Sequence, residues 1–314
     1  MTDNKQTDVR DQKTLGEYLQ KRGEWLHLLE EDEHHSVRRQ ITDLITNDML
    51  YRILNKARDS TLILEATCAT NPIIHMFITR SYVQDQILAI RKLNEKNSVD
   101  HTKGVVSLRR LLTDIKANSN LITRENYVSG DGLPYDYETL SRKFRRNYVP
   151  GAIYPQQPHD KSEMLHFKFD RISGVKPDER SRKDTISDSI FQKLDSWMSE
   201  SGAKEIVEAG NKYLIHAADE KSRKYVSISQ FGFTFEQIEK IHRMFVRVEH
   251  CISSEILNSS FRGSVAPILA FGFAENLDRP YIAADALPAL HKEWRACEAE
   301  RQTWLDGINE ELFS

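Results

Sequence analysis

The residues best suited to chemistry lie in one helical, otherwise apolar stretch, which runs from Glu208 to Arg223. His216 lies beside the apolar stripe of this helix, with Lys212 one turn earlier and Asn211 at the edge of the same side. An imidazole that titrates near neutrality can act as a general acid or base when fixed hydrogen-bond donors lie beside it. The alternative is a structural role, because a single histidine on a helix is more often a surface residue or a satisfied core residue. The stripe itself recurs at three- and four-residue spacing: Ala203, Ile206, Val207, Gly210, Tyr213, Leu214 and Ala217.

Four segments, taken in chain order, carry a resemblance to a known family: Ser81–Leu93, Val106–Leu112, Asn211–Ala217 and Phe233–Ile241. The first resembles a helix with an aspartate followed by Ile-Leu-x-Ile-x-Arg-Leu, and the second a short Ser-Leu-x-x-Leu-Leu helix. The third resembles the segment Arg-Asn-Lys-x-x-x-His, and the fourth a closing helix. The family is that of HEPN domains, specifically the HEPN domain of AbiU-type abortive-infection proteins. The resemblance covers about residues 40–260, with a long insertion inside it.

The resemblance implies an antiparallel helical bundle that forms homodimers. In this family an Arg-x(4–6)-His motif faces the same motif of the partner subunit and cuts RNA without a metal or a cofactor. The motif arginine falls at Gly210 in this chain. A permanently charged, planar donor at that place would stabilise the phosphate charge of the transition state. Either another cation replaces it or the site is degenerate; the candidates are Arg180, Arg182, Lys212, Lys221 and Arg223.

The mechanism implied for an active site has three parts. His216 acts on the ribose 2′-hydroxyl as general base or on the leaving oxygen as general acid. Asn211 orients the phosphate, and Lys212 or an arginine from elsewhere stabilises the phosphorane. The alternative is a degenerate domain that binds RNA, a nucleotide or a partner protein without cutting, and a third reading is a helical adaptor. The biological setting implied is phage defence or toxin-like growth arrest, with an unknown defence or antitoxin partner.

Basic clusters elsewhere are candidates for RNA contact. The strongest has Arg142, Lys143, Arg145 and Arg146, followed by Tyr148, so that cations lie beside a ring able to stack on a base. Arg180, Arg182 and Arg223 are further candidates. Arg109 and Arg110 form a basic face that is either solvated or in contact with phosphate. Arg243 and His250 give a rival Arg-x(6)-His pair, which lacks the neighbouring asparagine. For each cluster the alternative is a solvated surface.

Composition sets the remaining limits. The chain has 314 residues, 39% of them hydrophobic, and a formal net charge of −3, so any RNA contact must come from local patches. Its three cysteines lack metal-type or redox-type spacing, which fits a reducing cytoplasm. No apolar run is long enough to span a bilayer, so no membrane is expected. Walker, dinucleotide and His-Glu-x-x-His motifs are absent, and no metal site is predicted.

The periodicity predicts an all-α fold with a partly irregular insertion and a C-terminal helix. Residues 1–13 are expected to be a disordered tail, 14–262 the HEPN-like domain with an insertion at about 118–180, and 263–314 a packing or dimerisation segment. A short strand is predicted at Met164–Phe169. The predicted helices are 14–33, 36–58, 72–92, 107–116, 136–146, 184–199, 203–218, 234–257 and 288–311.

Overall fold

The computed structural model describes residues 8–64, 72–96, 104–147, 149, 155–212, 221, 234–259, 264–265 and 287–303. Within these ranges every regular element is a helix and no strand occurs, so the predicted all-α fold is confirmed. The chain divides into two compact units, Met1–Pro267 and Ile268–Ser314. Among the described helices, none combines the length and apolarity needed to cross a bilayer.

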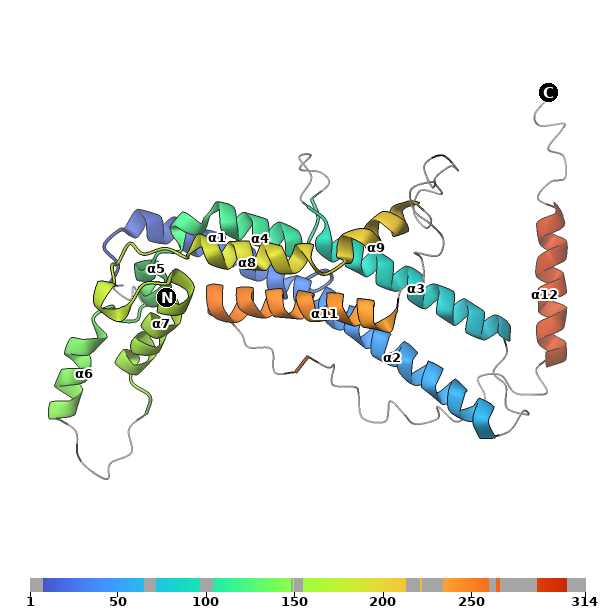
Figure 1. Ribbon diagram of the computed structural model, residues 1–314, viewed down its shortest axis with the longest axis horizontal. Helices are drawn as coiled ribbons and strands as arrows, with labels where there is room; N and C mark the ends of the chain where they lie inside the picture. The colour runs from blue at the N-terminus through green and yellow to red at the C-terminus, as the bar shows by residue number, and fades with distance from the viewer. Residues whose placement is uncertain are drawn as a thin grey trace. The chain divides into compact units, whose positions relative to one another are not determined.

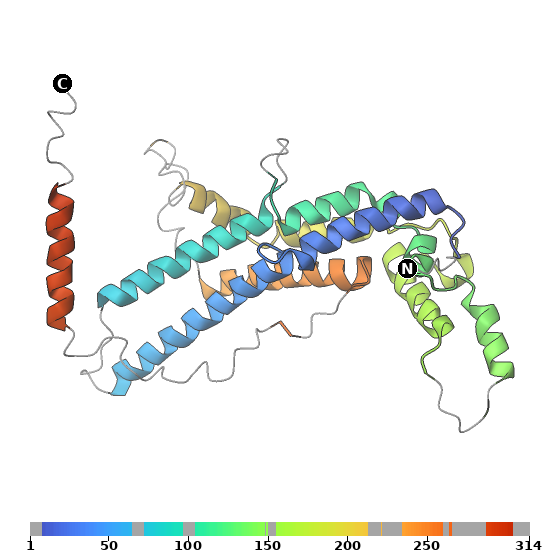
Figure 2. The same ribbon diagram turned by 180° about the vertical axis from the view of Figure 1, so that it is seen from behind.

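The first unit is organised around two long helices, α2 (Val37–Leu64) and α3 (Pro72–Asn94), which lie side by side and antiparallel (Figures 1 and 2). Helix α11 (Phe235–His250) packs against α2, and α9 (Ala203–Gly210) packs against α3. Burial of apolar surface drives this packing. The fully buried core joins all of these helices through side chains such as Ile41, Ile87, Ile90, Phe191 and Phe245.

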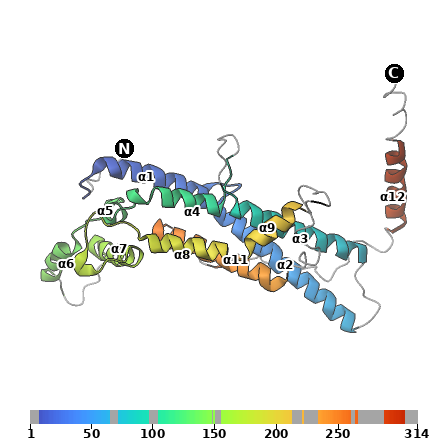
Figure 3. The same cartoon turned by 45° about the horizontal axis from the view of Figure 1, so that its top comes forward.

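Three further helices cover the same core. These are α1 (Gln12–Leu26), which continues as the π-helix His27–Glu31, α4 (Leu108–Ala117) and α8 (Asp188–Ser199). Figure 3 shows α1 and α4 side by side along one edge of the unit. Helix α4 begins where predicted, because the Ser107 hydroxyl accepts the backbone N–H of Arg110 at 3.0 Å.

Hydrogen bonds to side chains fix where the helices begin. Thr234, the first residue of the predicted helix 234–257, caps α11 in a capping box: Gln237 N–H donates to Thr234 Oγ1 at 3.2 Å, and Thr234 N–H donates to Gln237 Oε1 at 3.0 Å. The predicted start of α1 at Thr14 is wrong by two residues, because Asp11 caps the helix instead. Thr14 donates to Asp11 twice, from its backbone N–H at 3.0 Å and from its hydroxyl at 2.7 Å.

The predicted insertion is more helical than its prolines and glycines indicated. It holds α5 (Arg124–Ser129), α6 (Tyr137–Arg146) and α7 (Pro158–Ser173), with the short 3₁₀ turns Ser119–Leu121 and Pro177–Glu179. The predicted strand at Met164–Phe169 is wrong, because these residues lie within α7. Its buried positions follow a helical spacing: His159, Ser162, Leu165, His166, Phe169 and Ile172. Pro158 opens α7, and Gly174 closes it in the left-handed conformation at φ 74°.

The two halves of α3 have different surroundings. Ile87, Ile90 and Leu93 in its second half are fully buried, whereas Ile73 and Phe77 near its start are each 70% exposed. The apolar pattern of this segment predicts a helix central to the bundle, and the structure buries one side of its second half, where Leu88 is still 40% exposed.

A chain of buried hydrogen bonds links α2, α3 and α11. Gln86 Nε2 donates to the backbone oxygen of Leu44 at 3.2 Å, and Gln86 Oε1 lies 2.9 Å from His242 Nε2. Because the amide nitrogen faces a carbonyl, the amide oxygen must face the imidazole, and His242 Nε2 must therefore carry its proton. This arrangement leaves Nδ1 of His242 as an acceptor.

The second unit contributes the helix α12 (Leu287–Gln302). Trp294 on this helix is 74% exposed and Leu290 is 43% exposed. The predicted helix 288–311 continues past residue 303, outside the described part of this unit. The described part of α12 therefore presents large apolar side chains to solvent.

Candidate functional site

The end of α9 carries the predicted catalytic segment. Gly210 is buried there against Ile87 of α3, and a Cβ built on Gly210 would come 2.2 Å from Ile87 Cγ2. Real Cβ atoms do not approach a neighbour that closely, so the backbone of α9 meets α3 only because residue 210 has no side chain. At position 210 this chain therefore has a glycine that packs directly against α3, with no room for a side chain.

Asn211 and Lys212 follow directly and lie together at the end of α9. Asn211 is partly buried, and its Oδ1 atom has no hydrogen-bond partner among the described residues. Lys212 Nζ lies 3.4 Å from Glu208 Oε1, one turn earlier, with the lysine side chain 22% exposed. Asn211 and Lys212 are neighbours in the sequence, so their proximity is not evidence for the predicted site. His216, like Arg223, lies outside the described residues, and the catalytic trio stays a prediction.

Helix α6 carries the strongest predicted RNA-binding cluster. Arg142, Lys143, Arg145 and Arg146, called here the α6 cations, are all exposed, and within the described part of the chain no carboxylate pairs with any of them. Asp136 caps this helix by accepting the Thr139 N–H at 3.1 Å. The hydroxyl and backbone N–H of Thr139 lower the pKa of Asp136, so the cap stays ionised. Helix α6 is therefore a capped surface helix with uncompensated positive charge.

The other predicted cluster is neutralised within the fold. Arg180 forms a bidentate ion pair with Asp170, with Nη2 to Oδ2 at 2.6 Å and Nε to Oδ1 at 3.0 Å. Arg182 is paired with Glu125 and lies 4.0 Å above the ring of Tyr135. Both side chains are mostly buried by these contacts, so the structure does not present them as free cations for RNA.

Neither of these arginines is near α9 in the structure. Their partners belong to α5, α7 and the segments beside them, and Figures 1 and 3 show α7 and α9 at opposite ends of α8. As described, Arg180 and Arg182 therefore do not supply the charge missing at Gly210. Lys212 is the candidate cation that lies beside that position.

Arg124 is a charged residue that sequence reasoning missed. It is fully buried and bonds two carboxylates, with Nη1 to Asp170 Oδ1 at 2.7 Å and Nε to Asp184 Oδ2 at 2.8 Å. Burial alone would raise the pKa of Asp170, but hydrogen bonds from Arg180 and Arg124 outweigh it and lower that pKa. No local pattern signals this network, because its members are far apart in the sequence. It is a buried scaffold that holds α5, α7 and the segment before α8 together.

The rival Arg-x(6)-His pair lies on α11. Arg243 is 69% exposed on its side chain and pairs with Glu239 at 2.9 Å, while His250 is partly buried at the end of the helix. Arg247, between them, lies 4.2 Å above the ring of Trp197. Arg243 and Arg247, but not His250, line a hollow of about 530 Å³ beside α2 and α11, which His242 also lines. Burial lowers the pKa of His242 to about 4, so this imidazole is neutral near pH 7.

A metal site has no support in the described residues, where no group of three or more His, Cys, Asp or Glu side chains converges. The acidic residues Glu30–Glu33, after α1, include two that bond nearby groups of the protein. Glu30 pairs with Arg38, and Asp32 accepts the N–H groups of His34 and His35. Cys251 has a pKa raised to about 11 by burial, which makes it an inert thiol.

Comparison with known proteins adds no relative. No family model matches this chain, and neither a curated protein nor a solved structure matches it.

Proposed function

We propose that this chain is an RNA-directed protein of the HEPN type. The observation that carries the proposal is the contrast between two basic clusters of the insertion. Arg180 and Arg182 are matched to carboxylates, whereas the α6 cations are exposed and have no acidic partner among the described residues. Phosphates of a nucleic acid are the anions that such a helix attracts, and the released counterions favour binding. Arg142, Arg145 and Arg146 share one face of α6, which suits contact with successive phosphates of an RNA backbone.

In its active form the protein would be a homodimer that cuts RNA without a metal. His216 would act as general base or general acid, Asn211 would orient the phosphate, and Lys212 would stabilise the phosphorane. Two observations support this assignment. The buried Oδ1 atom of Asn211 lacks a partner among the described residues, and Lys212 lies beside it at the end of α9. The setting would be phage defence or toxin-like arrest in the cytoplasm, with a defence or antitoxin partner.

The second candidate is a domain of the same type that binds RNA, a nucleotide or a partner protein without cutting. Gly210 favours it, because the contact with Ile87 leaves no space for the family's arginine. The packing also shows that Gly210→Arg cannot restore that arginine, since even a Cβ overlaps Ile87. Cleavage must therefore be tested at His216 rather than at residue 210.

RNA binding is tested with the full chain and a labelled single-stranded RNA in a fluorescence anisotropy titration. Replacing the four α6 cations by glutamine should weaken binding at least tenfold. The matched control replaces four exposed cations on other helices by glutamine: Lys13, Arg39, Arg171 and Lys193. Both variants lower the net charge equally. Equal losses of RNA affinity would therefore show that only overall charge matters, and would refute the α6 assignment.

Cleavage is tested with the same RNA in the presence of EDTA. The active form predicts cleavage that survives EDTA and disappears in His216→Ala. Undiminished cleavage in His216→Ala would refute the site assignment. Binding without any cleavage by the unaltered chain would support the second candidate.

A further inference from the structure

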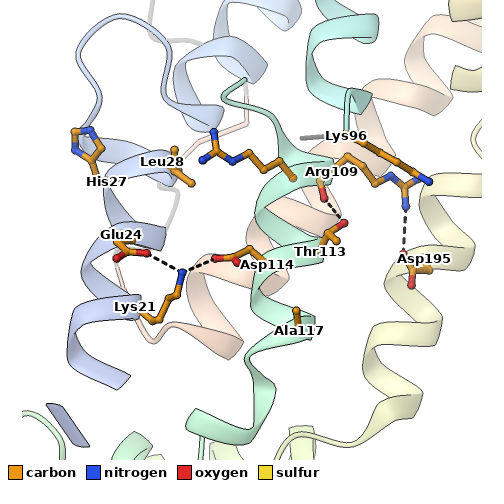
Figure 4. A pocket seen from close by; sticks show the side chains of 11 residues that line it. Lys21, Glu24, His27, Leu28, Lys96, Arg109, Thr113, Asp114, Ala117 and Asp195 are labelled. Atoms are coloured by element: carbon orange, nitrogen blue, oxygen red, sulfur yellow. Dashed lines mark hydrogen bonds and ion pairs between the residues drawn. The ribbon is translucent and has the colours of Figure 1, made fainter. Parts of the chain in front are cut away.

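A polar pocket of about 830 Å³ lies between α1 and α4, in a part of the unit that the proposed RNA contact does not use (Figure 4). Helix α1 and the π-helix after it contribute one wall, and α4 contributes the other. Asp195 of α8 and Lys96, which follows α3, complete the lining. Most lining residues are charged or polar, and Leu28, Ala117 and the carbon stems of the long side chains add apolar surface, so the pocket suits a ligand with polar groups on a carbon skeleton.

At one end of the pocket a single ammonium group lies between two carboxylates. Lys21 Nζ lies 2.8 Å from Glu24 Oε2 and 3.4 Å from Asp114 Oδ2, as the dashed lines in Figure 4 show. Asp114 Oδ2 also accepts the indole N–H of Trp25 at 2.7 Å. These bonds hold the carboxylates in place, and carboxylate oxygens accept hydrogen bonds from hydroxyl groups.

The other end has an excess of positive charge. Lys96 and Arg109 lie there with Asp195, and Figure 4 shows Thr113 between this end and the end that holds Glu24 and Asp114. Arg109 Nη1 is 3.2 Å from Asp195 Oδ1. The Arg109 side chain is 15% exposed, and burial lowers its pKa, which means that its guanidinium is poorly solvated.

Arg110 adds a second guanidinium to the lining. Its Nη1 atom donates to the backbone oxygen of Val105 at 2.6 Å, and no carboxylate in the described ranges pairs with it or with Lys96. Asp195 also accepts from Lys116 Nζ at 2.9 Å. Arg109 can therefore turn to an incoming anion while Lys116 keeps Asp195 neutralised. Three cationic groups are thus available to one ligand.

We propose that this pocket binds a phosphate monoester whose body carries hydroxyl groups, the chemical class of the sugar phosphates. The phosphate dianion would take charge-assisted hydrogen bonds from Arg109, Arg110 and Lys96, where guanidinium groups bind two oxygens at once. The hydroxyl groups would lie toward Thr113 and the carboxylates of Glu24 and Asp114.

The test is isothermal titration of the full chain with ribose 5-phosphate, ribose and inorganic phosphate. Ribose 5-phosphate should bind at least tenfold more tightly than inorganic phosphate, and ribose should not bind measurably. Arg110→Ala should weaken the binding of ribose 5-phosphate at least tenfold. The matched control is Arg39→Ala, because Arg39 Nη1 also donates to a backbone oxygen, that of Glu33 at 2.6 Å, outside the pocket. This control should bind like the unaltered chain.

Three results would overturn the proposal. These are no binding of ribose 5-phosphate at millimolar concentration, an affinity for ribose equal to that for ribose 5-phosphate, or an equal loss of affinity for ribose 5-phosphate in Arg110→Ala and Arg39→Ala. Lys96→Ala provides a second variant if Arg110→Ala fails to fold, because Lys96 is exposed and precedes α4. RNA binding should be the same in both pocket variants. Failure of this inference is therefore distinguishable from failure of the proposed RNA function.

Discussion

Gly210 of α9 lies so close to Ile87 of α3 that a Cβ on residue 210 would be 2.2 Å from Ile87 Cγ2. Ile87 is fully buried, so its side chain has no open space into which it could move. The two helices thus meet at a position where one of them contributes backbone only. The same residue stands where the resemblance places a catalytic arginine, and packing explains why this chain has glycine there.

Gly210→Ala should destabilise the fold. Overpacking a core typically costs about 1–3 kcal/mol, and this substitution should lower the free energy of unfolding by that order. Chemical denaturation followed by circular dichroism measures it. The matched control is Gly23→Ala in α1, where nothing lies within 4 Å of the added Cβ. That change should stabilise by about 0.5–1 kcal/mol, because alanine suits a helix better than glycine.

The same contact predicts coupling between the two positions. Ile87→Ala removes Cγ2 and should itself cost about 2–5 kcal/mol through the cavity it leaves. The double variant Gly210→Ala/Ile87→Ala should be more stable than the sum of the two single losses predicts, because the new methyl group occupies part of that cavity. Strict additivity in this double-mutant cycle would contradict the close contact.

Two buried histidines predict how stability depends on pH. Burial lowers the pKa of His242 and that of His166 to about 4, against an ordinary value of 6.5. The unfolded chain therefore binds more protons than the folded chain between these values, so stability must fall as the pH drops from 6.5 toward 4. His242→Gln should flatten this fall when the free energy of unfolding is measured at several pH values. An unchanged slope would show that His242 titrates normally.

The buried network of the insertion predicts a large loss in Arg124→Ala. This variant leaves Asp170 and Asp184 without their fully buried partner, and breaking a buried ion pair costs about 3–5 kcal/mol. Arg171→Ala is the control, because Arg171 pairs with Glu255 while its side chain is 65% exposed. An exposed pair contributes about 0–1 kcal/mol. If Arg124→Ala and Arg171→Ala lowered the melting temperature equally, this result would contradict the buried network.

The RNA proposal predicts a specific change in salt dependence. Each phosphate contact with single-stranded nucleic acid contributes about 0.7 to the slope of log K against log salt concentration. Replacing the α6 cations by glutamine should therefore reduce the slope by up to about 3, if each of the four contacts one phosphate. Anisotropy titrations at several salt concentrations measure this slope. A weaker affinity with an unchanged slope would mean that α6 acts without contacting phosphates.

Local chemistry made much of the fold predictable. Ser107, Thr234 and Gln237 fixed the starts of α4 and α11, because capping depends on residues only three positions apart. The strand predicted at Met164–Phe169 was wrong because two aromatic residues there alternate over a few positions. Pro158 and Gly174 marked the true ends of α7, and these signals span a longer window than the alternation.

The candidate site was less predictable because its properties depend on distant partners. Arg180 and Arg145 look alike in the sequence, yet Asp170 neutralises the first and no described carboxylate neutralises the second. The role of Gly210 likewise depends on Ile87, which lies in another helix. Pairings of this kind have no fixed spacing, so only the folded chain reveals them.

The hydrogen-bonded chain from Leu44 through Gln86 to His242 has a mechanical consequence. Apolar contacts are non-directional, so helices held by them alone could slide past one another by a helical turn at modest cost. A buried amide that must satisfy a carbonyl on one side and an imidazole on the other accepts a single axial alignment. Gln86 therefore fixes how far α2, α3 and α11 are shifted along their axes relative to one another.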